Sequence, residues 1–153
     1  MTNATLTGQD IAEAQGAVRG LLDNVLATTG TTATEYVVLR VISARGEFAP
    51  AALTEFLQGQ RQLDLDEIGV LDLLGGLAEK DLITGWPPRA SGPVRLSATG
   101  AAEFAALNDK VAAVTARLYG GMDGAELTTA HRVLRAVIER ATELRHQLSD
   151  TGH

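Results

Sequence analysis

Residues 63–100 read LDLDEIGVLDLLGGLAEKDLITGWPPRASGPVRLSATG, and this stretch predicts a helix followed by a two-stranded hairpin. Asp66 is the candidate N-cap of the helix, because an aspartate carboxylate can accept the first free amide protons. The helix should bury one face, since apolar residues recur at the i, i+3, i+4 and i+7 positions. These residues are Val70, Leu73, Leu74 and Leu77.

Two short strand-like pieces, 82–84 and 94–96, follow this helix. The loop between them is rich in glycine and proline, which is typical of a hairpin. Residues 97–100 then open a long alanine-rich helix. The order along LAEKDLITGWPPRASGPVRLSATGAAEF (77–104) resembles the core of the MarR family of winged helix-turn-helix transcription regulators. In that family the corresponding stretch contains the end of the recognition helix, the wing and a Leu-Thr-x-x-Gly turn.

Three apolar seams with alternating spacings of three and four residues lie outside this core, at 11–25, 104–118 and 127–148. Such seams are used by helices that pack nearly parallel against long partners, either within one chain or between two. We favour an intertwined homodimer, because one small winged core cannot cover seams at both chain ends. The resemblance also implies dimerisation through terminal helices.

We therefore expect one mainly α domain (1–153) with a small β-hairpin wing, a winged helix core at 32–99, and dimerisation helices within 8–28 and 100–148. Within the core, Thr32 or Thr34 should cap a helix that runs to about Arg45, residues 46–50 should break it, and residues 51–57 should form a short helix. Residues 120–124 should mark the break between the last two helices.

The composition fits a compact helical protein, and eleven Arg against two Lys, with abundant Ala and Gly, suggest a GC-rich bacterial genome. The 153 residues are 45% hydrophobic and only 4% aromatic, which favours aliphatic helix packing in a core of useful size. The absence of cysteine excludes disulfides, thiolate zinc sites and a cysteine-based oxidant sensor. No apolar run approaches the ~20 residues that a bilayer requires, and no signal peptide is visible, so we expect a cytoplasmic protein.

Enzymatic motifs are missing from the sequence. There is no phosphate-binding glycine motif and no nucleophile elbow. Glu143 and His146 share one helical face, but without a third ligand nearby a surface pair is the better interpretation. We therefore expect neither an enzyme nor a bound metal or cofactor.

The resemblance implies that the outer face of the 67–79 helix would meet double-stranded DNA. The candidate residues on this face are Ile68, Gly69, Leu71 and Asp72. An isoleucine or leucine can touch a thymine methyl group, and an aspartate can accept a proton from the cytosine amine. Residues 62–81, however, hold six acids and one base, a local charge of −5 that opposes contact with phosphates. The same face therefore also fits a protein-contact patch or a simple solvated surface.

Three arginines around the helix and wing are the candidate phosphate contacts: Arg61, Arg89 and Arg95. Arg89 and Arg95 give the wing a local charge of +2, although Arg95 can instead pair across the hairpin or with the acidic helix. We expect a dimeric, DNA-binding transcription regulator. The alternative is a winged-helix protein-interaction module that has lost direct DNA binding.

The resemblance further implies a small-molecule pocket where the dimer helices meet the winged core, often for aromatic or phenolic acids. The candidate effector-binding residues are Val25, Tyr36, Val37, Arg40 and Phe104. In this interpretation the Arg40 guanidinium donates two hydrogen bonds to the carboxylate of the ligand, and apolar side chains form the wall of the pocket. Alternatively, Tyr36 is a core residue and Arg40 a solvated helix charge.

Overall fold

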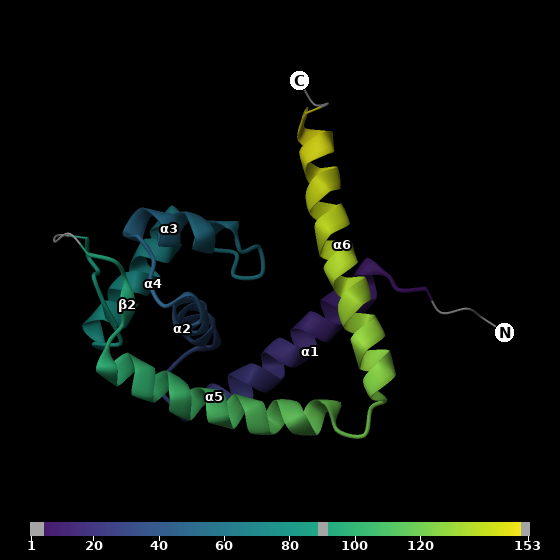
Figure 1. Ribbon diagram of the computed structural model, residues 1–153, viewed down its shortest axis with the longest axis horizontal. Helices are drawn as coiled ribbons and strands as arrows, with labels where there is room; N and C mark the ends of the chain where they lie inside the picture. Colours follow the sequence, from purple (N-terminus) through teal and green to yellow (C-terminus); the bar gives the residue numbers. More distant parts are fainter. Residues whose placement is uncertain (1–4, 89–91, 151–153) are drawn as a thin grey trace. The chain divides into compact units, whose positions relative to one another are not determined.

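The computed structural model describes residues 5–88 and 92–150, and Figure 1 shows its ribbon. The elements are α1 (Gly8–Leu26), α2 (Ala33–Arg45), α3 (Pro50–Gly59), α4 (Glu67–Glu79), β1 (Ile83–Thr84), β2 (Arg95–Leu96), α5 (Ala98–Tyr119) and α6 (Gly124–Asp150). The chain divides into two compact units, Met1–Val114 and Thr115–His153. The predicted fold class, mainly α with a small hairpin, is confirmed.

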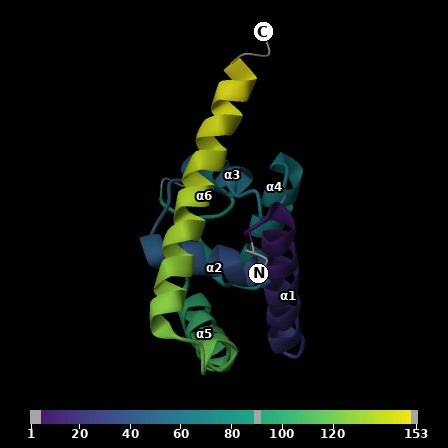
Figure 2. The ribbon, with the colours of Figure 1, turned by 90° about the vertical axis from the view of Figure 1, so that its right-hand side faces the viewer.

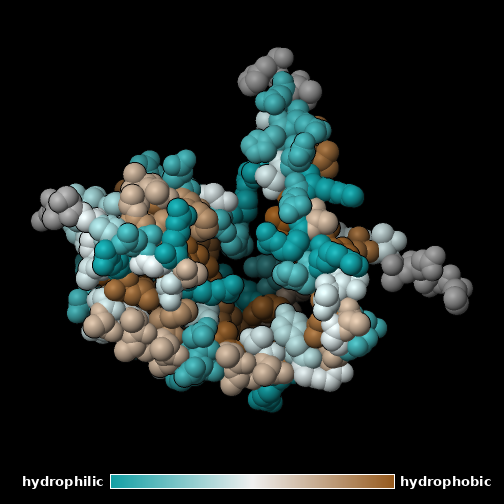
Figure 3. Space-filling model, viewed as in Figure 1, coloured by the Kyte–Doolittle hydropathy of each residue, from teal (hydrophilic) through white to brown (hydrophobic). Residues whose placement is uncertain are grey.

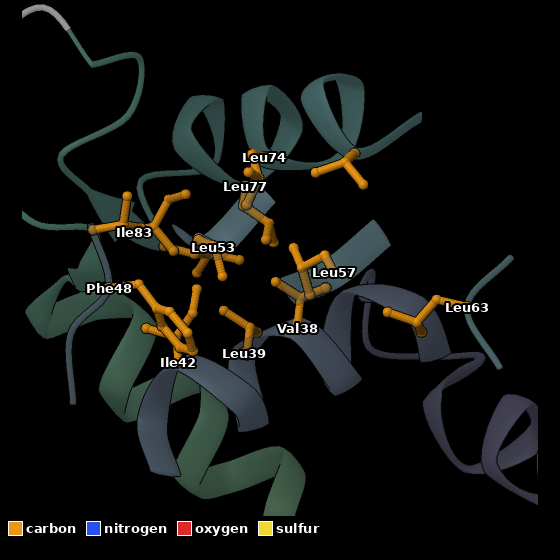
Figure 4. Packing of buried hydrophobic residues seen from close by; sticks show 13 residues of the cluster. Val38, Leu39, Ile42, Phe48, Leu53, Leu57, Leu63, Leu74, Leu77 and Ile83 are labelled. Atoms are coloured by element: carbon orange, nitrogen blue, oxygen red, sulfur yellow. The ribbon is translucent and has the colours of Figure 1, made fainter. Parts of the chain in front are cut away.

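The winged core is organised around α2, α3 and α4. Helices α3 and α4 contact each other and lie side by side in both ribbon views (Figures 1 and 2). Their leucines and the apolar face of α2 point toward one another in the interior, together with residues of the wing (Figure 4). Fully buried side chains of this cluster are Val38, Leu39, Ile42, Leu53, Leu57, Val70, Leu74, Leu77 and Val94.

Helix α4 forms where the sequence predicts it. Asp66 is the N-cap, and its Oδ1 accepts a hydrogen bond of 2.7 Å from the Gly69 N–H. Of the predicted apolar face, Val70, Leu74 and Leu77 are buried, and Leu73 is half-buried against the same cluster. The cap and the apolar periodicity therefore fix both the start and the rotation of this helix.

The wing is an antiparallel hairpin in which Ile83 lies opposite Leu96 and Thr84 opposite Arg95. A third segment joins it, because the backbones of Phe48 and Val94 exchange hydrogen bonds of 3.0 and 2.7 Å. The sequence did not predict this third pairing. It anchors the connection between α2 and α3 to the base of the wing.

The turn from the wing into α5 explains why a glycine stands at position 100. The Ser97 N–H donates to the Leu82 carbonyl at 3.0 Å, and the Gly100 N–H donates to Ser97 Oγ at 2.8 Å. A Cβ added at Gly100 would overlap the carbonyl oxygen of Leu82. Only glycine permits this close approach of helix and strand.

The starts of α2 and α3 follow from their first residues. The predicted cap of α2 was Thr32 or Thr34, and Thr32 is the N-cap, in a capping box with Glu35. Helix α3 is longer than the predicted 51–57 helix, because Pro50 serves as its first residue instead of breaking the chain. Proline suits this position, where its missing N–H has no helical partner to lose.

The second unit is dominated by α6, in which no residue is buried. The predicted break before it is present: α5 ends at Tyr119, Gly121 has a φ of 85°, and Asp123 Oδ1 accepts from the Ala125 N–H at 3.2 Å. Figure 3 shows hydrophobic atoms exposed among hydrophilic ones along this helix. Within residues 5–88 and 92–150, no helix is long and apolar enough to cross a membrane.

Candidate nucleic-acid interface

The outer face of α4 is apolar and acidic. Ile68 is 69% exposed and Leu71 is 42% exposed, and Asp72 lies beside them in solvent. Gly69 is only half-buried and sits at the cap, where an added Cβ would press on the Asp66 and Leu65 side chains. Three of the four predicted contact residues therefore lie on the open face, while Gly69 belongs to the start of the helix.

The one base of the α4 segment is engaged in an ion pair with α2. Lys80 Nζ lies 3.0 and 2.9 Å from the two carboxylate oxygens of Glu35 and donates to the Gly30 carbonyl at 3.2 Å. Burial raises the pKa of Glu35, but hydrogen bonds from Lys80 and from the Thr32 backbone outweigh it, so the pKa is lowered. Glu35 is therefore ionised at neutral pH and holds the lysine against α2.

Arg61 lies in the turn between α3 and α4, and its side chain is exposed. The turn is held by backbone hydrogen bonds from Leu63 N–H to the Gln60 carbonyl (3.0 Å) and from Asp64 N–H to the Arg61 carbonyl (3.2 Å). Within the described ranges Arg61 forms no ion pair. Its guanidinium is thus available to a phosphate immediately before the helix that the resemblance assigns to DNA.

Of the two wing arginines, the described residues include Arg95. Arg95 Nη2 lies 2.7 Å from Glu47 Oε2, and both side chains are more than half exposed. Its partner belongs neither to the hairpin nor to α4, the two alternatives that the sequence suggested. Such an exposed pair is worth about 0–1 kcal/mol, so a phosphate can compete for the arginine. Arg89 falls in 89–91, outside the described residues.

Tyr36 and Phe104, two of the predicted effector-binding residues, pack against each other. Their rings stack with centroids 5.8 Å apart, and the Tyr36 hydroxyl donates to Asn108 Oδ1 at 2.9 Å. Burial raises the pKa of Tyr36, and the charge of Arg40 offsets part of this rise. Tyr36 is buried in a cluster with Leu26, so its ring serves as core in the single chain.

Val37 and Arg40 line an open pocket between α2 and α3, and Val37 also packs against the Tyr36 cluster. Val25 is half-buried on α1 and lines neither this pocket nor the Tyr36 cluster. Tyr36, Val37 and Phe104 thus share one cluster, and Val37 connects it to the pocket that Arg40 lines. Among the described residues, the lining of this pocket includes neither Tyr36, Phe104 nor Val25. The role of the five candidates in binding an effector stays a prediction.

Comparisons with known proteins show a likeness in fold. No protein-family model and no curated protein matches the sequence. The reduced form of MarR from E. coli superposes with a TM-score of 0.69 at 21% identity, covering 88% of this chain and 95% of that one. This chain has the MarR fold. A MarR family regulator from Silicibacter pomeroyi gives 0.67 at 18% identity, with 87% and 91% covered. A MarR family protein from Mycobacterium tuberculosis, solved in complex with DNA, gives 0.64 at 22%, with 87% and 98% covered.

Two features of this version of the MarR fold were missed from the sequence. Glu47 pairs with Arg95 because the Phe48–Val94 bridge brings the α2–α3 connection to the wing. An extended Glu47-Phe48 pair between Gly46 and Pro50 was the available signal. The Glu35–Lys80 pair had no local signal, because 45 residues separate its members.

Proposed function

We propose that this chain is a homodimeric, DNA-binding transcription regulator of the MarR type. The observation that carries the proposal is the presentation of α4, which buries one face in a packed helix-turn-helix and leaves the other face open beside a hairpin. The M. tuberculosis protein with the same fold was solved bound to DNA, which supports the assignment. Winged helices place such a helix in the major groove.

Affinity for DNA must come from few cations. Lys80 is engaged with Glu35, so the proposed phosphate contacts are Arg61, Arg89 and Arg95 in each subunit. Two copies would bring six guanidiniums to the duplex, enough for salt-dependent binding. The outer face of α4 supplies at most apolar contacts to thymine methyl groups and one acceptor, Asp72.

The dimer is proposed from the exposed apolar residues of α6. Leu134, Val137 and Leu144 are each more than a third exposed, and all three belong to one predicted seam. Contiguous apolar stripes of this kind are rare on monomers, and a second copy of the chain would cover them. Release from DNA by a small aromatic ligand completes the proposal.

The test is fluorescence polarisation with labelled upstream and random duplexes over a series of salt concentrations. Wild type should bind, and its affinity should fall steeply with salt. Arg61→Ala should weaken binding to all sequences about equally and flatten the salt slope by roughly one unit for each phosphate that the arginine neutralises. Arg132→Ala, which removes an exposed arginine of α6, is the matched control and should bind like wild type.

A protein-interaction module is the second candidate function, and the exposure of Ile68 and Leu71 within an acidic segment favours it. Asp72→Arg separates the two functions. If α4 approaches the duplex, the new cation should raise nonspecific DNA affinity. Absence of binding by wild type and by this variant at every salt concentration would leave the interaction module as the better function.

A further inference from the structure

The outer face of α4 carries an apolar stripe that lies open to solvent. Ile68, Leu71 and Gly75 follow one another at i, i+3 and i+7, so they share one side of the helix. Ile68 is 69% exposed and Leu71 is 42% exposed. Leu74 and Leu77 point the other way, into the interior (Figure 4). The first three residues, Ile68, Leu71 and Gly75, are called the outer stripe below.

Two glycines in the middle of α4 are not required by the packing of the described chain. A Cβ added at Gly75 or Gly76 would meet no described atom within 4 Å, and neither glycine has a positive φ. Glycine in a helix interior is less favourable than alanine, so both positions weaken the helix without an internal gain. The missing side chains do leave a shallow surface beside Ile68 and Leu71, on which another backbone can approach closely.

Acidic side chains border the outer stripe. Glu67, Asp72 and Glu79 each lie four residues from one of its members, which places them next to it on the helix surface. All three are exposed, and none forms an ion pair with another described residue. Lys80, which follows α4, pairs with Glu35 instead. An apolar surface bordered by carboxylates without cationic partners is complementary to a cationic amphipathic helix.

We propose that the outer stripe binds a cationic amphipathic helix of another protein, with leucines on one face and lysines or arginines beside them. Its leucines lie over Ile68 and Leu71 and approach α4 most closely at Gly75, and its cations face Asp72 and Glu79. Phosphates suit this surface less well, because the carboxylates repel them. The proposal deepens the second candidate function by naming the chemistry of its partner.

A consequence for DNA follows, and it rests on the proposed DNA-binding function. One face of α4 cannot meet a groove and a second helix together. The docked helix should therefore displace the duplex, by as much as its own affinity and concentration allow.

Docking is tested on the full chain without DNA, by fluorescence anisotropy of a labelled synthetic helix with the repeat Leu-Lys-Lys-Leu-Leu-Lys-Leu. Wild type should bind this peptide at least about tenfold more tightly than a version with glutamate for lysine, or a scrambled version without an apolar face. Ile68→Ser should weaken binding about tenfold, because most of one apolar contact is lost. Asp72→Asn should weaken binding and flatten its salt dependence. Asp109→Asn removes an exposed acid of α5 and is the matched control, which should bind like wild type.

Gly75→Gln separates docking from a structural role. The new side chain meets open space within the chain and favours the helix, so the variant should have a higher Tm than wild type. It also covers the outer stripe, so peptide binding should fall about tenfold. Gly16→Gln, at a position of α1 where an added Cβ also meets open space, should raise the Tm and leave peptide binding unchanged.

Failure of the peptide to bind wild type overturns the docking site, as does equal binding by wild type, Ile68→Ser and Gly75→Gln. Equal weakening by Asp72→Asn and Asp109→Asn would mean general attraction to a chain of net charge −6, and it also overturns the site. A second copy on the stripe would exclude the peptide, and Ile68→Ser would then lower the mass found in sedimentation.

Adding DNA distinguishes docking from the proposed function. Saturating peptide should release a labelled duplex from wild type but not from Gly75→Gln, and unchanged DNA binding with peptide bound overturns the competition. If Ile68→Ser loses DNA binding and keeps peptide binding, the face belongs to DNA and the docking site is overturned. Peptide binding by a chain that binds no DNA at any salt concentration overturns the DNA-binding function and leaves the docking site standing.

Discussion

Replacing Lys80 by methionine should destabilise the winged core. Methionine retains most of the apolar stem but removes the ammonium group, which hydrogen-bonds both carboxylate oxygens of Glu35 and the Gly30 carbonyl. Glu35 is only 6% exposed, so the variant leaves a nearly buried carboxylate with Thr32 as its remaining hydrogen-bond partner. The loss should therefore exceed that of a surface ion pair.

The degree of burial sets the expected magnitude. Removing one partner of a fully buried pair costs about 3–5 kcal/mol, and exposed pairs are worth about 0–1 kcal/mol. The Lys80 side chain is 45% exposed and that of Glu35 is 9% exposed, which places this pair between the two limits. We expect a loss of about 2 kcal/mol and a fall in Tm of about 4–8 °C. Glu35→Gln should cost less, about 1 kcal/mol, because the lysine it leaves behind is hydrated.

Urea unfolding followed by circular dichroism at pH 7 and pH 4 measures both effects. The folded pKa of Glu35 lies below its ordinary value of 4.5, so the pair stabilises the fold above that pH. The stabilisation is lost as the pH falls below 4.5 and through the folded pKa, and Glu35→Gln should lack this part of the acid sensitivity. Lys110→Met removes an exposed lysine and serves as the control. Equal stability of the Lys80 and Lys110 variants would refute the reasoning.

Three further changes test other parts of the structure. Gly100→Ala should lower the Tm although alanine favours helices, because its Cβ would overlap the Leu82 carbonyl. The control Gly16→Ala meets open space and should stabilise the fold by about 0.5–1 kcal/mol. Leu134→Asp should convert a dimer into 16.1 kDa monomers in sedimentation equilibrium; a monomeric wild type would refute the dimer. Arg95→Ala should change stability by less than about 1 kcal/mol but weaken DNA binding, and unchanged polarisation would place the wing away from the phosphates.

The sequence predicted those parts of the fold that depend on residues close together in the chain, such as a helix cap, a turn or a repeating apolar face. Helix α4 was predictable because Asp66 caps it and its apolar residues repeat on one face. The hairpin was predictable from two short apolar runs around a glycine- and proline-rich loop. The Phe48–Val94 bridge was not, because pairing at a single residue leaves no period in the sequence. The start of α3 was placed one residue late, because proline both ends helices and begins them.

In the candidate interface, two cations pair with acids that are distant from them in the sequence. Counting along the chain gives an acidic α4 segment with one lysine and a wing with two arginines. In the structure Lys80 is engaged by Glu35, and Arg95 is shared with Glu47. Both partners lie on or next to α2, far from these cations in sequence. Arg61 is therefore the described cation of this interface that has no acidic partner, and it stands between the two glutamines that line the α2–α3 pocket. We infer that DNA affinity should be most sensitive to changes in this turn.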